Sequence, residues 1–114
     1  MTSPITSHVL DTSRGKPAAN LGITLAAKSD SGEWVALIST TTNDDGRALD
    51  LLAAGTLEAR VYRLSFATGP YFHALGLPVF YELVEIQFHV TDVSEHYHIP
   101  LPLSPYGYST YRGS

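Results

Sequence analysis

Alternation of apolar and polar residues with a period of two is the feature that most restricts what this chain can fold into. Residues 84–90, VEIQFHV, place Val, Ile, Phe and Val on one side and Glu, Gln and His on the other. The same alternation marks residues 21–27 and 97–103, and residues 34–42 are rich in β-branched side chains. Because successive side chains of a strand point to opposite faces, each run predicts a strand.

Turn residues separate these runs. The sequences DSG at 30–32 and NDDG at 43–46 are typical of hairpin loops. Short strands with turns at this spacing predict an all-β sandwich of seven or eight strands.

One short helix is expected over residues 69–75. Thr68 can cap its N-terminus and Pro70 suits its first turn, while Gly76 and Pro78 end it.

Two segments depart from regular strand patterns. Within residues 57–66 the apolar phase slips at Val61–Tyr62, which indicates a bulge or a strand covered on both faces. Pro100 and Pro102 remove every second backbone donor on one side of the strand at 97–103. That strand should therefore lie at an edge of its sheet, or have that side free of pairing.

Composition narrows the function classes. With 114 residues, the chain is expected to form a single domain, 1–114. A net charge of −4 and a pI of about 5.6 argue against nucleic-acid binding. Without cysteine the chain has no disulfide, thiol nucleophile or cysteine metal ligand. No stretch approaches the ~20 apolar residues that span a bilayer, and the N-terminus lacks a secretory pattern, so a cytoplasmic protein is expected.

Five histidines are the first candidates for proton transfer. His73 and His89 are expected to be solvated surface residues. His96 and His98 share a strand face because residues i and i+2 point the same way. Such a pair can chelate a metal, but it needs a third ligand that the local sequence does not supply. The favoured interpretation from spacing is two exposed polar residues.

The remaining candidates are ambiguous when taken from the residues alone. His8 lies in a short apolar run and fits a structural histidine better than a catalytic base. Arg47 is either a solvated hairpin residue or a planar fork for a carbonyl-rich or anionic ligand. The tyrosine-rich C-terminus, residues 104–114, fits an edge strand or a docked chain end. Phosphate loops, nucleophile elbows and dinucleotide fingerprints are missing from the sequence. These residues predict no particular reaction.

Four segments together resemble the transthyretin family: SHVLDTSRGKPA at 7–18, TNDDGR at 42–47, YFHALGLPVFYELVEIQFHV at 71–90 and HYHIPLPLSPYGYSTYRGS at 96–114. The terminal YRGS is similar to the closing signature of the family's 5-hydroxyisourate hydrolase branch. The resemblance covers residues 5–114. It implies a transthyretin-like β-sandwich of two four-stranded sheets with one short helix. It also implies a homotetramer, built as a dimer of dimers, with active sites in the channel between the dimers.

The resemblance also implies a reaction. The expected activity is hydrolysis of 5-hydroxyisourate to 2-oxo-4-hydroxy-4-carboxy-5-ureidoimidazoline, a step of urate degradation in purine catabolism. It is a cyclic amide hydrolysis that needs no metal and no organic cofactor. The family's catalytic positions fall on residues of matching type, and the set comprises His8, Arg47, His98 and Ser114, with Arg47, Tyr111 and Ser114 binding substrate.

Roles follow from the chemistry of amide opening. His98 is expected to be the general base on water, with His8 orienting or shuttling the proton, although the sequence does not decide between the two histidines. Arg47 would hold the carbonyl-rich substrate and offset developing charge. Pro102 stands where the resemblance leads us to expect leucine, which puts local backbone pairing in doubt.

Two other functions compete. A transthyretin-type carrier of small hydrophobic ligands would use the same channel, but the polar set of His8, Arg47 and His98 suits an apolar ligand poorly. A non-catalytic β-sandwich interaction module would have no need of channel histidines or of a YRGS terminus.

Overall fold

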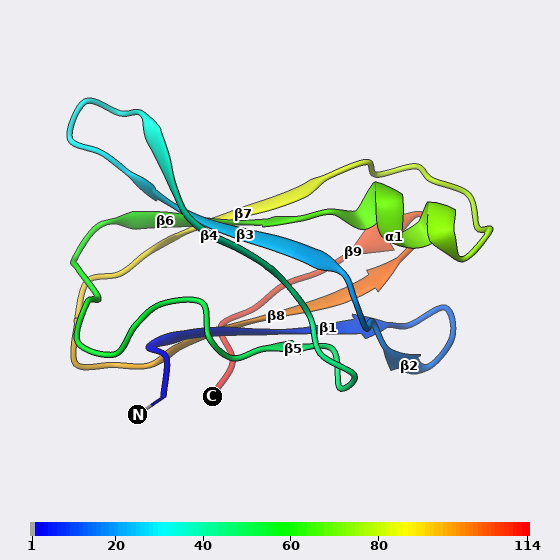
Figure 1. Cartoon of the computed structure of the whole chain (residues 1–114), viewed down its shortest axis with the longest axis horizontal. Coiled ribbons are helices and arrows are strands. Elements are labelled where there is room, and N and C mark those ends of the chain that lie inside the picture. Colours follow the sequence, from blue (N-terminus) through cyan, green and yellow to red (C-terminus); the bar gives the residue numbers. More distant parts are fainter. Residues whose placement is uncertain (1) are drawn as a thin grey trace.

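The computed structural model describes residues 2–114 as two layers of strands with one short helix at one end (Figure 1). One sheet runs in the order β4-β3-β6-β7 and the other in the order β2-β1-β8-β9, with β5 also paired to β1. The strands are β1 Ile5–Asp11, β2 Lys16–Pro17, β3 Gly22–Lys28, β4 Trp34–Thr41, β5 Arg47–Ala48, β6 Val61–Phe66, β7 Val84–His89, β8 Tyr97–Ser104 and β9 Gly107–Tyr108. The predicted all-β sandwich is confirmed.

The strand count differs from the expectation because three of the nine strands contain only two residues each. β2 pairs with the end of β1, at Leu10↔Pro17 and Asp11↔Lys16, and thereby becomes a fifth strand in its sheet. The transthyretin-like arrangement of two packed sheets holds, but one of them carries five strands instead of four.

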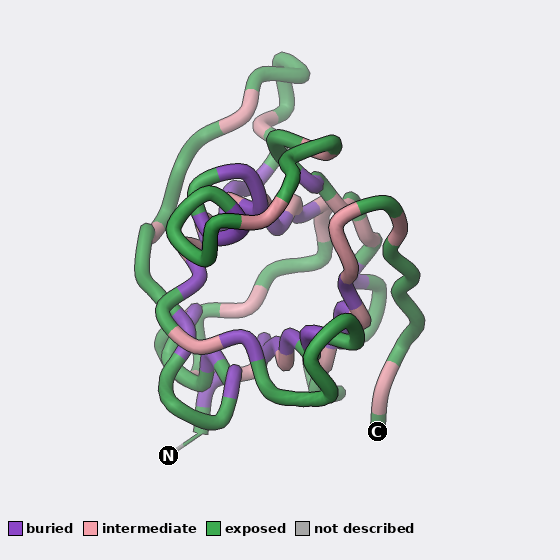
Figure 2. The backbone as a smooth tube through the Cα atoms, turned by 90° about the vertical axis from the view of Figure 1, so that its right-hand side faces the viewer, coloured by how far each residue is buried: buried purple, intermediate pink, exposed green. Residues whose placement is uncertain are grey.

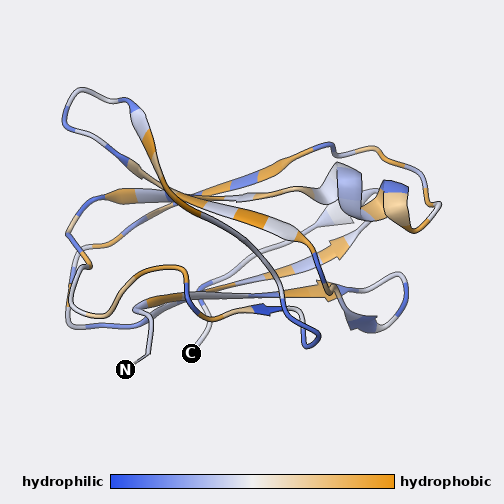
Figure 3. Ribbon diagram, in the orientation of Figure 1, coloured by the Kyte–Doolittle hydropathy of each residue, from blue (hydrophilic) through white to orange (hydrophobic). Residues whose placement is uncertain are grey.

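Alternating side chains from both sheets form the core. In β6 the buried positions are Tyr62, Leu64 and Phe66, and the residues between them are partly exposed. Figure 2 shows the buried positions lining the space between the layers, and Figure 3 shows the hydrophobic residues concentrated along the strands. The faces turned away from the core are therefore free for polar side chains.

The irregular segment at 57–66 resolves differently from the prediction. β6 begins at Val61, so the expected strand is wrong for residues 57–60. Its pairing with β7 is regular from Val61↔His89 to Phe66↔Val84. The register shift lies instead between Leu25 and Ala26 of β3, opposite β4. The alternation of β6 is thus continuous within the true strand.

The helix α1 spans Thr68–Ala74, one residue earlier than expected. Its N-cap is Ala67, which has no side chain able to accept a hydrogen bond, so the predicted capping by Thr68 is wrong. The Thr68 hydroxyl is buried and donates to the carbonyl of Tyr81. It thereby ties the helix to the segment that leads into β7. No helix within residues 2–114 has the length and hydropathy required to cross a membrane.

A buried carboxylate fixes the turn after β1 to the helix. The Asp11 side chain is fully buried and accepts hydrogen bonds from Ser13, from Arg14 Nε (3.0 Å) and from the Tyr71 hydroxyl (2.8 Å). Burial alone would raise the pKa of Asp11, but these hydrogen bonds together hold it below its usual value. The network joins β1, the β1–β2 turn and α1.

β8 lies between β1 and the C-terminal segment, so its predicted place at a sheet edge is wrong. The regular ladder to β9 covers only Leu103 and Ser104. Beyond it the C-terminal segment donates to carbonyls of β8: Ser109 N–H to Pro102 (3.1 Å) and the Thr110 hydroxyl to Pro100 (2.8 Å). The backbone carbonyls of Pro100 and Pro102 thus face the C-terminal segment, which donates to them and needs no donor in return. This agrees with the alternative expectation that this side of the strand has no regular pairing.

Candidate active site

The parallel pairing of β1 with β8 brings together residues about ninety positions apart. Thr6 lies opposite His98, and His8 lies opposite Pro100. On the other side of β1, the antiparallel pairing with β5 places His8 opposite Arg47. Ile5, Ser7 and Val9 of β1 are fully buried. Because strand side chains alternate, Thr6 and His8 therefore point to the outer face of this sheet.

Three of the sequence-predicted residues line one pocket of about 340 Å³ on this face: Arg47, His98 and Ser114. Thr2, Thr6, Leu49 and His96 complete its lining. His8 is not part of the lining, but it is the neighbour of Arg47 across the β1–β5 pair and lies close enough to His98 to influence its charge. The structure therefore gathers His8, Arg47, His98 and Ser114 in one region.

The Thr6 hydroxyl holds two histidine rings at once. Its Oγ1 lies 2.8 Å from His96 Nε2 and 2.8 Å from His98 Nδ1. Thr6 is itself buried, with 7% of its surface exposed. The two rings lie roughly parallel, 23° apart. The side chain of His98 is thus fixed from the β1 side by a short hydrogen bond.

The C-terminal segment fixes the other side of His98. Gly113 N–H donates to the His98 carbonyl (2.8 Å), and this pair forms an isolated β-bridge. A Cβ at Gly113 would lie only 2.5 Å from His98 Cδ2 and 3.1 Å from Pro100 Cγ. Only glycine therefore lets the chain end pass this close to the ring, and the next residue, Ser114, reaches the pocket.

The pKa values of His8 and His98 are both lowered, which favours the neutral form of each ring. Burial is the main cause that lowers the pKa of His98, followed by the positive charge of Arg47 and by His96 and His8. The pKa of His8 is also lowered, again by burial first and then by Arg47. A neutral imidazole can accept a proton, so the arrangement provides bases beside a cation.

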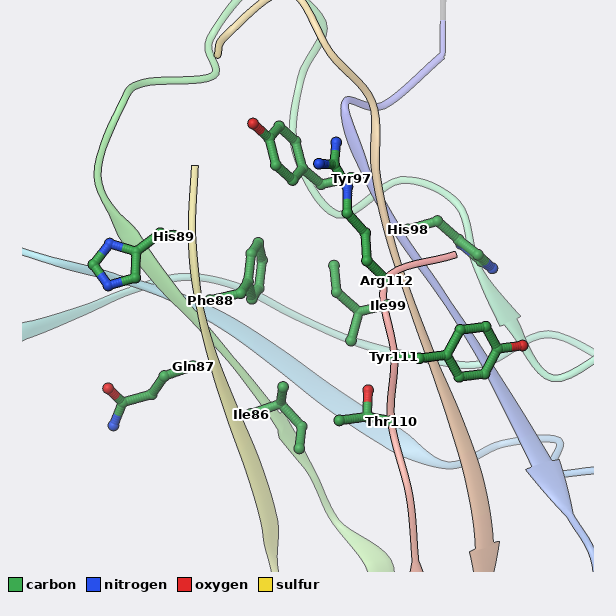
Figure 4. Close-up of a pocket in the computed structure, with 10 residues that line it drawn as sticks. All are labelled: Ile86, Gln87, Phe88, His89, Tyr97, His98, Ile99, Thr110, Tyr111 and Arg112. Carbon is green, nitrogen blue, oxygen red and sulfur yellow. The ribbon is translucent and has the colours of Figure 1, made fainter. Parts of the chain in front are cut away.

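Tyr111 lies apart from Arg47 and Ser114 but shares a second cavity with His98. This cavity, of about 270 Å³, lies between β7 and the C-terminal segment (Figure 4). In that view its ring extends to the same side of β8 as His98, away from Ile86 and Phe88. Its side chain is 62% exposed and does not line the pocket of Arg47, His98 and Ser114.

Arg112 anchors the chain end next to Tyr111. Its guanidinium lies 4.4 Å from the centre of the Tyr97 ring, and its Nη2 donates to the His96 carbonyl (3.3 Å). A longer contact of 3.7 Å joins it to Glu95. These contacts of Arg112, which the sequence marked only as part of the YRGS terminus, explain how the terminal residues are held against β8.

Sequence reasoning also missed Thr6, and it missed the connection of His96 to His98 through that hydroxyl. Thr6 precedes His8 by two residues, so strand alternation placed both on one face. The parallel register that sets Thr6 opposite His98 left no trace in the local sequence. His73 and His89 are exposed, as expected. Among residues 2–114, no three His, Asp or Glu side chains gather in a group suited to a metal ion.

Comparison with known proteins agrees with this architecture. The sequence profile of the HIUase/Transthyretin family matches residues 5–113, nearly the whole chain. The chain belongs to the HIUase/Transthyretin family. Among solved structures, sea bream transthyretin in complex with thyroxine superposes with a TM-score of 0.93 at 28% identity and covers 97% of this chain and 95% of that one.

Relatives within the family include proteins named as hydrolases. The 5-hydroxyisourate hydrolase of Caulobacter vibrioides is 45% identical, covering 98% of this chain and 99% of its own. That of Halalkalibacterium halodurans is 44% identical over the full length of both chains. A probable 5-hydroxyisourate hydrolase of Caenorhabditis elegans is 44% identical and covers 99% of this chain and 83% of its own. Identity to these family members exceeds identity to the sea bream transthyretin.

Proposed function

We propose that this chain is a hydrolase that opens the ring of 5-hydroxyisourate in urate degradation. The observation that carries the proposal is the pocket on the outer face of the β1–β8 pair, where His98, its pKa lowered by burial and by Arg47, shares the lining with Arg47 and Ser114. The full-length relatives named 5-hydroxyisourate hydrolase support the same substrate. The reaction is the hydrolysis of a cyclic amide.

The chemistry needs three things, and the pocket has a group for each. A neutral imidazole of His98 accepts a proton from water as the water oxygen attacks the ring carbonyl carbon. Arg47 binds the carbonyl-rich substrate and stabilises the charge that develops on that carbonyl oxygen. The carbon–nitrogen bond then breaks, and the departing nitrogen takes back the proton, with His8 orienting or shuttling it. Water is thereby added across the amide bond, and neither a metal nor an organic cofactor takes part in this scheme.

The C-terminal segment completes the site. Ser114 lines the pocket and supplies a hydrogen bond to the bound substrate. Tyr111 lies outside this pocket within one chain, so its part in binding requires that the pocket be closed further. We propose a homotetramer built as a dimer of dimers, in which a second copy faces the pocket. Leu49, at the pocket and 47% exposed, is an apolar residue that such a copy would cover.

A carrier of small hydrophobic ligands is the weaker alternative. The sea bream transthyretin shares the fold and is described in complex with thyroxine. Here, however, Arg47 and two histidines line the pocket, and burying them against an apolar ligand would cost the free energy of desolvating polar groups. The polar lining favours the hydrolase. The expected cytoplasmic location stays a prediction that fractionation of source cells would test.

An ultraviolet assay tests the function directly. 5-Hydroxyisourate is generated in the cuvette from urate by urate oxidase, and its decay is followed with and without the protein. The wild-type chain should accelerate the decay, and His98→Ala should lower the rate about 10²–10⁴-fold, the usual effect of losing a general base. His73→Ala, which removes an exposed histidine from α1, is the matched control and should keep full activity. Decay at the spontaneous rate with folded wild-type protein would refute the hydrolase and favour the carrier.

A further inference from the structure

The hydroxyl of Thr6 has one proton but lies within hydrogen-bond distance of two ring nitrogens. Both contacts, to His96 Nε2 and to His98 Nδ1, measure 2.8 Å. A hydroxyl donates one hydrogen bond and accepts others. With neutral rings, three arrangements satisfy both contacts. Thr6 donates to His98 and accepts from His96, or donates to His96 and accepts from His98, or accepts from both rings.

These arrangements differ in whether His98 can accept a proton through Nε2. If Thr6 donates to His98 Nδ1, the proton of the neutral ring must lie on Nε2, and that nitrogen is no base. In the other two arrangements His98 donates from Nδ1 to Thr6, and its Nε2 carries a free lone pair. The choice therefore decides whether the outer end of the ring can accept a proton.

The surroundings of His98 favour donation from its Nδ1. Nδ1 faces Thr6, and Cδ2 faces Gly113, so the ring is held between β1 and the chain end. Ring geometry then places Nε2 at the outer end, next to Cδ2. Arg47 lines the same pocket as His98, and its positive charge acts on the His98 ring. Because a guanidinium is a donor only, an unprotonated Nε2 suits this pocket better than a second N–H.

We propose that Thr6 is a positioning residue whose hydroxyl oxygen accepts a hydrogen bond from His98 Nδ1–H and thereby holds His98 in the Nδ1–H tautomer. His96, on the same hydroxyl, helps to fix the position of the Thr6 side chain. A neutral histidine ring in water favours the tautomer with the proton on Nε2. Holding His98 in the Nδ1–H tautomer is therefore useful where Nε2 must act as a base. The inference rests on the proposed function for its catalytic consequence, but the tautomer itself can be measured independently.

Nitrogen NMR of the imidazole rings is the direct test. In wild-type protein at a pH where His98 is neutral, its Nε2 should give the signal of an unprotonated ring nitrogen and its Nδ1 that of a protonated one. Thr6→Val keeps the shape and strand preference of the side chain but removes the hydroxyl. In this variant, the Nε2-protonated form should appear, and Thr6→Ser should restore the wild-type pattern. A wild-type His98 protonated on Nε2 would overturn the proposal, whether or not any variant folds.

Turnover gives the second readout. Loss of one hydrogen bond that sets a tautomer should lower kcat about 3- to 10-fold in Thr6→Val, with KM little changed, and Thr6→Ser should recover most of it. Ser7→Ala is the matched control, because Ser7 also joins β1 to β8 through its hydroxyl, at 2.7 Å to the Ile99 carbonyl, but faces the core. It should keep the wild-type tautomer and kcat.

The outcomes separate the two proposals. A wild-type chain that does not accelerate 5-hydroxyisourate decay but shows the Nδ1–H tautomer would end the proposed function and leave the role of Thr6 in place. An active enzyme whose Thr6→Val variant keeps full kcat and the wild-type tautomer would refute Thr6 as the positioning residue and leave the function standing.

Discussion

Gly113 gives the sharpest test of how the chain end shapes the site. In Gly113→Ala the new Cβ would stand 2.5 Å from His98 Cδ2, about 0.9 Å short of the 3.4 Å at which ordinary van der Waals contact begins. Thr6 restrains His98 from the opposite side through a 2.8 Å hydrogen bond. The ring can escape only by breaking that bond. Otherwise the terminus must move, which displaces Ser114 from the pocket.

Either response misplaces a reacting or binding group by nearly 1 Å. A shift of about this size can reduce turnover about 10²-fold, because proximity and orientation provide much of the rate. Stability should change far less. If Gly113 no longer pairs with His98, the chain loses one backbone hydrogen bond, which costs on the order of 1 kcal/mol.

The assay compares kcat and urea unfolding for Gly113→Ala and Gly107→Ala. Gly107 lies in the same terminal region, but a Cβ there would meet only Ser104 Oγ at 3.7 Å, so this variant should resemble wild type in both measurements. If Gly113→Ala folds and turns over at the wild-type rate, close contact of the terminus with His98 plays no part in catalysis.

Two further predictions concern charge. Arg47→Gln removes a cation that lowers the pKa of His98, so the pKa of His98 should rise and the acid limb of the kcat/KM profile should move to higher pH. An acid limb that stays in place would mean that the charge of Arg47 does not act on the catalytic base. Asp11→Asn removes the buried charge that accepts hydrogen bonds from Arg14 and Tyr71, and urea unfolding should show that the free energy of unfolding falls by about 2–3 kcal/mol. A fall below about 0.5 kcal/mol would mean that the network does not stabilise the turn.

Local patterns were enough to predict most of the fold. Alternation placed β3, β7 and β8, since one face of each of these strands meets the core, and richness in β-branched residues placed β4. The pattern failed where apolar residues lay outside a strand, as at residues 57–60, and where a buried hydroxyl had a tertiary partner, as Thr68 has in Tyr81. Both errors arise because the sequence does not show which segment covers which.

The site depended on information of another kind. Residue types alone left His8, Arg47 and His98 as separate and ambiguous polar residues, and the family resemblance assembled them. The physical reason is the parallel pairing of β1 with β8, whose register is set by packing across about ninety residues and not by any turn. Thr6 acts through that register and Gly113 through its bridge to His98, so no spacing within one segment could have identified either residue.

Pro102 illustrates how a departure from a family pattern can be judged from geometry. The expectation was that proline at this position would disturb local pairing. Its carbonyl accepts from Ser109 N–H at 3.1 Å, and the neighbouring Pro100 carbonyl accepts from Thr110. N–H and C=O of one strand residue point to the same side, so the missing donor would have faced this same terminal segment. The segment is held by its own donors, Ser109, Thr110 and Gly113, and a proline in β8 leaves all three in use. Docking of the chain end, and with it the position of Ser114, therefore does not depend on a backbone N–H at position 102.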